Sequence, residues 1–148
     1  GSGPGQLDLP HSIAADREGN IYVADRTNRR IPVFDTEGNL LRTLVLNAEF
    51  DKSMQPVLGN VNPDLPDETR PWALCMSPGE PQYLWAADDH PGRIYKLTLD
   101  GEILGMLGES GKQLGQFNWI HGIDCSQEGV LYIADLNNWR VQKLILNP

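Results

Sequence analysis

Two histidines stand at the same place in two copies of a repeated stretch, and their side chains could bind a metal. His11 belongs to PHSIAADREGNIYVADRTNRRIPVFDTEG (residues 10–38), and His121 belongs to IHGIDCSQEGVLYIADLNNWRVQKLI (residues 120–145). Neutral imidazole is a standard zinc ligand, although two ligands alone make a weak site. The alternative is that each imidazole closes a loop as an ordinary part of the repeat. The residues themselves leave both interpretations open.

Arg26 is a further candidate because it departs from its own repeat. The other two copies have Asp89 and Leu136 at this place. A loop arginine can bind a carboxylate through two parallel hydrogen bonds. The simpler alternative is a solvated turn residue.

The four tryptophans occupy different places in the repeat. Trp72 takes the histidine position in the middle copy, and Trp119 lies two residues before His121. These two are expected near the mouth of the axis, where they could form the wall of a ligand site. Trp85 and Trp139 lie within or beside strands and are expected to pack one repeat against the next. His90, in the turn DDHPG, is expected at the surface.

The elements that position these side chains are predicted to be short strands joined by turns. The reason is that β-branched and aromatic residues alternate with small ones between clusters of Gly, Asn and Asp. The first copy predicts strands at 11–16, 21–25, 30–35 and 40–44. The second copy predicts strands at 72–76, 83–87, 93–98 and 103–107. The third predicts only three, at 121–125, 131–134 and 140–146. Residues 45–69, which contain three prolines, predict a long surface loop.

A repeated pair of charges sets the register of the copies. An aspartate follows an apolar strand ending in alanine, and an arginine comes five residues later. Because the pair recurs in every copy, its expected role is structural: the aspartate caps a turn and the arginine pairs with it. The three pairs are Asp25 with Arg30, Asp88 with Arg93, and Asp135 with Arg140.

Four-stranded units repeated in this way, with no helical periodicity, predict the blades of a β-propeller. We therefore expect an all-β chain forming a single domain over residues 1–148. Its blades are expected at about 9–44, 70–107 and 119–146, the last one incomplete. Such a chain is half of a six-bladed propeller.

An open arc of three blades would expose two apolar faces and a strand edge. Either the chain is the carboxyl half of a longer six-bladed chain, whose N-terminal part supplies the fourth strand of the last blade, or two copies close the ring. We expect the second arrangement, a face-to-face homodimer.

The charge of the chain argues against some partners. Lys and Arg number 12 against 20 Asp and Glu, and no basic stripe interrupts the acidity, so nucleic acid is not an expected partner. No apolar run approaches the length needed to cross a membrane, so no membrane partner is expected. No Ser-His-Asp order, Cys-His pair or phosphate-binding glycine loop stands out.

The two cysteines are not expected to pair. In the repeat register Cys75 aligns with Ala14 and Cys125 aligns with Ala15, so the two differ by one strand position. Side chains one position apart point to opposite faces of a sheet, which argues against a disulfide. The redox compartment stays open, and an extracytoplasmic or secreted location is one possibility.

The stretch PHSIAADREGNIYVADRTNRRIPVFD resembles an NHL repeat, the blade unit of a large propeller family. The resemblance extends over all three copies and is clearest in the first and third. It implies the fold well and the function poorly, since such propellers include enzymes and pure binding modules.

A sharper resemblance is carried by Pro10-His11-Ser12 together with VADRTNRRI at residues 23–31. These residues are similar to the peptidyl-α-hydroxyglycine α-amidating lyases. The resemblance implies a six-bladed propeller that holds zinc on its axis with three histidines from alternate blades. Such a lyase cleaves a peptidyl-hydroxyglycine to a peptide amide and glyoxylate.

The same resemblance implies His11 and His121 as zinc ligands and Arg26 as an active-site arginine. The third histidine, a further arginine and a tyrosine of the lyases would lie in the half that is absent from this sequence. Ile120 replaces a proline, and Trp119 stands in place of a methionine near the metal.

Two functions from different classes are therefore predicted. The first is a binding module that takes a peptide, a protein or another ligand at the axial mouth, with Trp72 and Trp119 in the site. The alternative is a zinc-dependent amidating-lyase-like enzyme with His11 and His121 as metal ligands and Arg26 as a carboxylate clamp.

Overall fold

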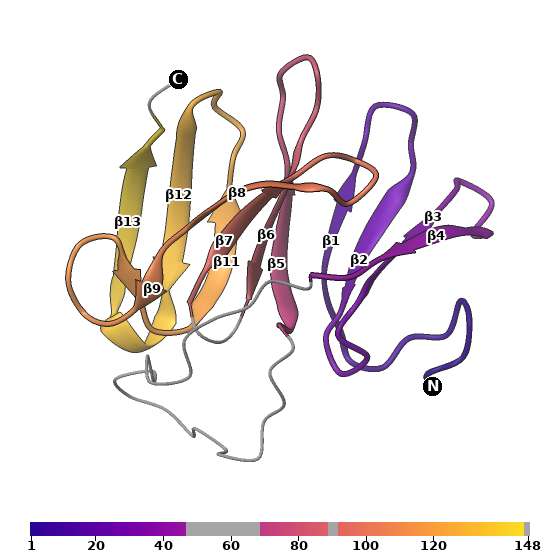
Figure 1. Cartoon of the computed structure of the whole chain (residues 1–148), viewed down its shortest axis with the longest axis horizontal. Helices are drawn as coiled ribbons and strands as arrows, with labels where there is room; N and C mark the ends of the chain where they lie inside the picture. The colour runs from indigo at the N-terminus through magenta and orange to yellow at the C-terminus, as the bar shows by residue number, and fades with distance from the viewer. Residues whose placement is uncertain (47–68, 89–91, 147–148) are drawn as a thin grey trace.

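The computed structural model describes residues 1–46, 69–88 and 92–146, which form three antiparallel sheets in chain order (Figure 1). Blade 1 holds β1 (Pro10–Ala15), β2 (Ile21–Asp25), β3 (Ile31–Phe34) and β4 (Leu40–Leu44). Blade 2 holds β5 (Pro71–Met76), β6 (Leu84–Asp88), β7 (Ile94–Leu97) and β8 (Ile103–Leu107). Blade 3 holds β11 (Ile120–Asp124), β12 (Val130–Asp135) and β13 (Arg140–Ile145), with a short 3-10 helix at Leu136–Asn138.

Each sheet is a meander whose strands pair in the order in which they occur in the chain. The predicted all-β class is confirmed, as are the two four-stranded blades and the three-stranded last blade. A short parallel pair, β9 (Glu109–Ser110) with β10 (Gln116–Phe117), precedes blade 3 and was not predicted. Most of the predicted loop at 45–69, and His90, lie outside the described residues.

The two hairpin turns at one end of blade 1 have the same chemistry. Asp16 and Asp35 begin the sequences DREGN and DTEGN, and each carboxylate accepts two backbone N–H bonds and one asparagine side-chain bond. Gly19 and Gly38 lie at φ 88° and 84°, where a glycine avoids steric strain. These turns therefore set which residues of adjacent strands face each other.

The hydrophobic core lies between the blades. Strands β1, β5 and β11 are the innermost strands, and β5 contacts both of the others. Between blades 1 and 2 the packed side chains include Tyr22, Val33, Leu74, Leu84 and Tyr95. A second cluster fills the space between blades 2 and 3, with Trp72, Trp85, Phe117, Leu131 and Ile133. Figure 1 shows the sheets arranged side by side around the innermost strands.

The repeated Asp–Arg pairs are structural, as predicted. The Nε of Arg30 lies 2.9 Å from Asp25, and the Nε of Arg140 lies 2.9 Å from Asp135. Both arginines also donate to three backbone carbonyls of the glycine-rich segment that precedes their blade. The acceptors are Ser2, Gly3 and Gln6 for Arg30, and Lys112, Gln113 and Gln116 for Arg140.

Tyr22 couples the stability of blade 1 to alkaline pH. Burial raises the pKa of Tyr22 to about 12, and its hydroxyl lies between Arg42 and Asp16. Because the folded pKa exceeds the unfolded value of 10.0, this stabilisation is present below pH 10 and is lost as the pH rises through 12. We expect the melting temperature of Tyr22→Phe to decrease less between pH 9 and pH 12 than that of the unsubstituted chain. Equal losses in both proteins would contradict this assignment.

Two expectations about side chains on the blades have different outcomes. Trp85 is buried in the core between blades 2 and 3, as predicted. The prediction for Trp139 is wrong, since this side chain is 94% exposed in the turn before β13. Its blade is the last of the three, so no further blade covers that turn within the described residues. No helix among the described residues is long and apolar enough to span a membrane.

Candidate axial ligand site

His11, Trp72 and His121 occupy equivalent places in the three blades. Each is the second residue of its innermost strand, and the pairing register with the next strand shifts there. Such bulges re-aim side chains and are common beside functional sites. The structure therefore brings together three residues that follow one another in the sequence at intervals of 61 and 49 positions.

The rings at these positions form a compact group. The ring centroid of Trp72 lies 3.9 Å from that of His11 and 5.9 Å from that of His121. The two histidine rings are 5.3 Å apart and nearly perpendicular. Trp119 completes the group, with its ring 5.1 Å from Trp72 in an edge-to-face arrangement. With Arg26, these residues form what we call the axial cluster.

Arg26 follows directly after β2 and reaches across to the next blade. Its guanidinium carbon lies 4.5 Å from the ring centroid of Trp72, which is a cation–π contact. Trp72 is only 6% exposed, whereas Arg26 is half-buried. The indole therefore supports one face of the guanidinium.

The hydrogen bonding of His11 determines which ring nitrogen is available. Its Nδ1 lies 3.0 Å from the backbone carbonyl oxygen of Trp72. A carbonyl oxygen only accepts, so Nδ1 carries the proton and Nε2 keeps its lone pair. Burial lowers the pKa of His11, and the nearby His121 and Arg26 lower it further. The hydrogen bond to the Trp72 carbonyl acts in the opposite direction but does not outweigh them. The neutral imidazole is the form that binds metals.

Trp119 lies at φ 72°, in the left-handed region that non-glycine residues seldom adopt. Leu9, its counterpart in blade 1, has a φ of 57°, so blades 1 and 3 share this conformation, which Arg70 of blade 2 does not adopt. The carbonyl of Trp119 accepts a bond from the N–H of Leu136, which holds the segment in place. Within the described chain, the buried Nε1 groups of Trp72 and Trp119 have no hydrogen-bond partner.

The two histidines fit a shared metal ion as a pair of donors, but they do not complete a site. Their 5.3 Å ring separation is compatible with two imidazoles binding one ion through nitrogens about 2.0–2.1 Å from it. The backbone bond at His11 Nδ1 is the outer contact that usually orients a ligating histidine. Over residues 1–46, 69–88 and 92–146 no group of three His, Cys, Asp or Glu side chains could hold a metal. Additional ligands would have to come from elsewhere.

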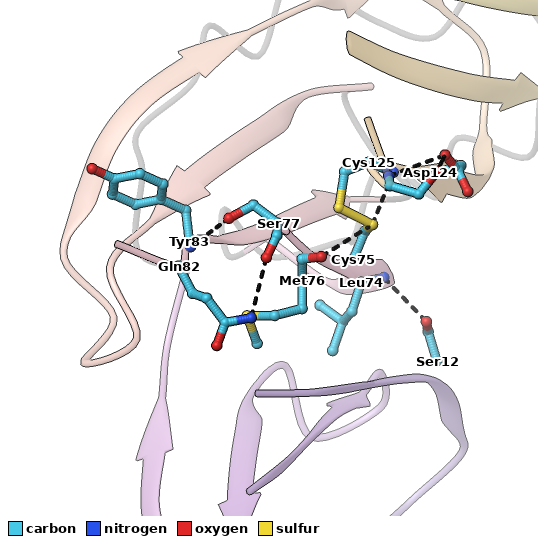
Figure 2. The surroundings of a disulfide bond; sticks show 10 residues. Ser12, Leu74, Cys75, Met76, Ser77, Gln82, Tyr83, Asp124 and Cys125 are labelled. Atoms are coloured by element: carbon cyan, nitrogen blue, oxygen red, sulfur yellow. Dashed lines mark hydrogen bonds between the residues drawn. A yellow bond between two sulfur atoms is a disulfide. The ribbon is translucent and has the colours of Figure 1, made fainter. Parts of the chain in front are cut away.

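The expectation that Cys75 and Cys125 do not pair is wrong. They form a disulfide between blades 2 and 3, with the Cα atoms 6.0 Å apart (Figure 2). The premise that they point to opposite sheet faces was sound, but the two residues belong to neighbouring sheets. One face of blade 2 packs against the opposite face of blade 3, so opposite directions bring the two sulfurs together. The signal in the sequence that could have revealed the pair is that the two cysteines lie in consecutive repeats at aligned positions that differ by one residue.

Residues 7–34 match the family model described as NHL repeat. The chain carries an NHL repeat. A 37-residue part of it is 49% identical to the human NHL repeat-containing protein 3, covering 25% of this chain and 11% of that protein. The NHL-repeat relationship expected from residues 10–35 is thereby confirmed.

A longer match extends over all three blades. The chain is 28% identical over 145 residues to mouse peptidyl-glycine alpha-amidating monooxygenase, covering 97% of this chain and 13% of that protein. The chain thus spans a small part of the curated relatives it matches. The sharper resemblance stated from residues 10–31 is confirmed as a distant relationship.

The fold is also shared with solved propellers. Virginiamycin B lyase from Staphylococcus aureus superposes with a TM-score of 0.57 at 14% identity, covering 94% of this chain and 42% of that one. Glutaminyl cyclase from Myxococcus xanthus gives 0.55 at 19% identity, with 89% and 46% covered. The chain therefore corresponds in fold to about half of a six-bladed propeller.

Proposed function

We propose that the axial cluster of this NHL chain binds a peptide or another ligand that carries a carboxylate. The observation that carries the proposal is the convergence of Arg26, stacked on Trp72, with the ring of His11 from blade 1 and the rings of Trp119 and His121 at the start of blade 3. Aromatic walls provide contact area, and a guanidinium binds a carboxylate through two parallel hydrogen bonds. The unpartnered indole N–H groups favour a ligand with acceptor atoms.

Calorimetric titration with paired peptides tests this function. A peptide with a free C-terminal carboxylate should bind more tightly than its amidated form, and Arg26→Ala should weaken the free acid by at least about tenfold. Arg17→Ala is the matched control, because Arg17 lies beyond the other end of β1. Binding that ignores both the carboxylate and Arg26 would exclude the proposed site.

A second candidate is a zinc-dependent amidating-lyase-like activity, favoured by the orientation of His11 and by the relative that matches 97% of the chain. In this proposal His11 and His121 hold zinc, and Arg26 binds the carboxylate of a peptidyl-hydroxyglycine. Bound zinc would supply Lewis-acid polarisation of a substrate oxygen. Trp72 would orient His11 through its carbonyl and exclude water with its ring.

Metal analysis of the purified chain tests the second candidate. We expect the affinity of the chain for zinc to fall at least about tenfold in His11→Ala and in His121→Ala. His90→Ala serves as the control, since His90 is the remaining histidine of the sequence. Release of glyoxylate from an N-acyl-α-hydroxyglycine measures the activity. Zinc content that is unaffected by either substitution would rule out this candidate.

We also propose that a second copy of the chain completes the ring. Tyr132 is 37% exposed in blade 3, whereas Tyr22, its counterpart in blade 1, is fully buried by blade 2. Ile13 is 69% exposed in blade 1, whereas its counterpart Leu74 is 6% exposed. These faces have the side chains of blade interfaces but no covering blade among the described residues. Light scattering should give the mass of a dimer, and Ile13→Asp should give a monomer; a monomeric unsubstituted chain would favour completion by other residues of a longer protein.

An extracytoplasmic or secreted location remains a proposal, supported by the Cys75–Cys125 disulfide. Disulfides persist mainly in oxidising compartments. Thiol trapping in cells, followed by mass determination, would show whether the pair is oxidised where the protein resides.

A further inference from the structure

We propose that the Cys75–Cys125 disulfide is a positioning clamp for the axial cluster, holding His121 at its place beside Trp72 and His11. The inference deepens the proposed function and rests on it only where ligand or zinc binding is measured. The disulfide joins β5, which carries Trp72, to the residue that directly follows β11, the strand that carries His121. It therefore acts on the site through the backbone, without touching a ligand.

The disulfide lies close to the axial cluster along the strands. Cys75 lies three residues after Trp72 in β5, and Cys125 lies four residues after His121, directly behind β11. At about 3.3 Å per residue, the two cysteines lie about 10 and 13 Å along the backbone from Trp72 and His121. A short strand transmits a shift over this distance, because its backbone is held by the neighbouring strand of the sheet.

Blade 2 is linked differently to blade 1 and to blade 3. Blades 1 and 2 are linked near the cluster by hydrogen bonds, from His11 Nδ1 to the Trp72 carbonyl and from Leu74 N to Ser12 Oγ at 3.1 Å. Blades 2 and 3 are linked by the disulfide itself and by the N–H of Cys125, which donates to Cys75 Sγ at 2.9 Å. Figure 2 shows the bond between Ser12 and Leu74 and the Cys75–Cys125 disulfide at adjacent residues of β5. Strand β5 is thus the common support, and the clamp fixes β11 to it.

The environment of the sulfurs makes the clamp testable in the folded chain. Cys125 lines a cleft of about 430 Å³ between blades 2 and 3, beyond the end of β5 that is remote from the cluster. Tyr83, Lys96 and Glu128 also line it. A small dithiol entering here would reduce the disulfide to two thiols and be oxidised to its own cyclic disulfide. The exchange consumes two electrons and two protons from the reagent and is reversed by an added oxidant.

The test compares the oxidised chain, the chain reduced with dithiothreitol, Cys75→Ala/Cys125→Ala, and Leu144→Ala. Leu144 packs on the same inter-blade core from the outer strand β13, so its truncation weakens the interface while leaving the disulfide and every residue of β5 and β11 unsubstituted. The readout that needs no ligand is NMR of the imidazole groups, through the nuclear Overhauser effects between His121 and the rings of His11 and Trp72. Zinc titration is the second readout.

We expect the contacts of His121 to weaken or disappear in the reduced and double-alanine chains, to persist in Leu144→Ala, and to return on reoxidation. Zinc affinity should fall at least about tenfold in the first two and less than about twofold in Leu144→Ala. Unchanged contacts in the reduced, folded chain would overturn the clamp. If the oxidised chain binds no zinc, the zinc proposal fails, while the NMR contacts still decide the clamp.

Discussion

Replacing Asp88 with alanine is expected to lower the free energy of unfolding by about 3–5 kcal/mol, as when one partner of a buried ion pair is removed. The carboxylate is fully buried and accepts bonds from Gly92 N at 3.0 Å, Arg93 N at 2.8 Å and Tyr95 Oη at 2.6 Å. It also pairs with the buried guanidinium of Arg93 at 3.4 Å. Alanine would leave a hydroxyl and a charge in the core without this acceptor.

Urea unfolding followed by circular dichroism measures this loss. Asp35→Ala is the matched control, because Asp35 caps a turn with similar backbone bonds but lies at the surface end of blade 1. Its effect should be much smaller, since water replaces the lost acceptor. Similar losses in the two variants would show that burial of the pair with Arg93 is not the cause.

Removing the disulfide through Cys75→Ala/Cys125→Ala is expected to lower the free energy of unfolding by about 4 kcal/mol. The two residues are 50 positions apart, and cross-linking a loop of this length restricts the unfolded chain by about that amount in the loop-entropy model. Reduction of the unsubstituted chain should give a loss of similar size. The measurement is urea unfolding with and without reductant.

The double variant itself provides the control for this prediction, because reductant should not change its stability further. A disulfide that contributed nothing would give coincident unfolding curves for oxidised and reduced protein. This result would also indicate that the core between blades 2 and 3 is sufficient to hold these sheets together.

The sequence determined the strands, their order and the class of fold. Period-two alternation and the Asp–Arg pairs are local signals, because each turn and each strand is specified by residues close in the chain. Repetition of the unit then implied blades without any knowledge of long-range contacts. The positions of His11 and His121 were predicted to be equivalent for the same reason, and the structure places their rings 5.3 Å apart.

Only the tertiary structure decided how neighbouring blades meet. The alternation of side chains along a strand tells which face of its own sheet a residue occupies, but not which face of the next sheet lies opposite. The Cys75–Cys125 disulfide was missed for this reason. The same limit explains Trp139, whose exposure depends on whether another blade follows. The stacking of Arg26 on Trp72 and the bond from His11 to the Trp72 carbonyl join different blades, and no spacing within one repeat encodes them.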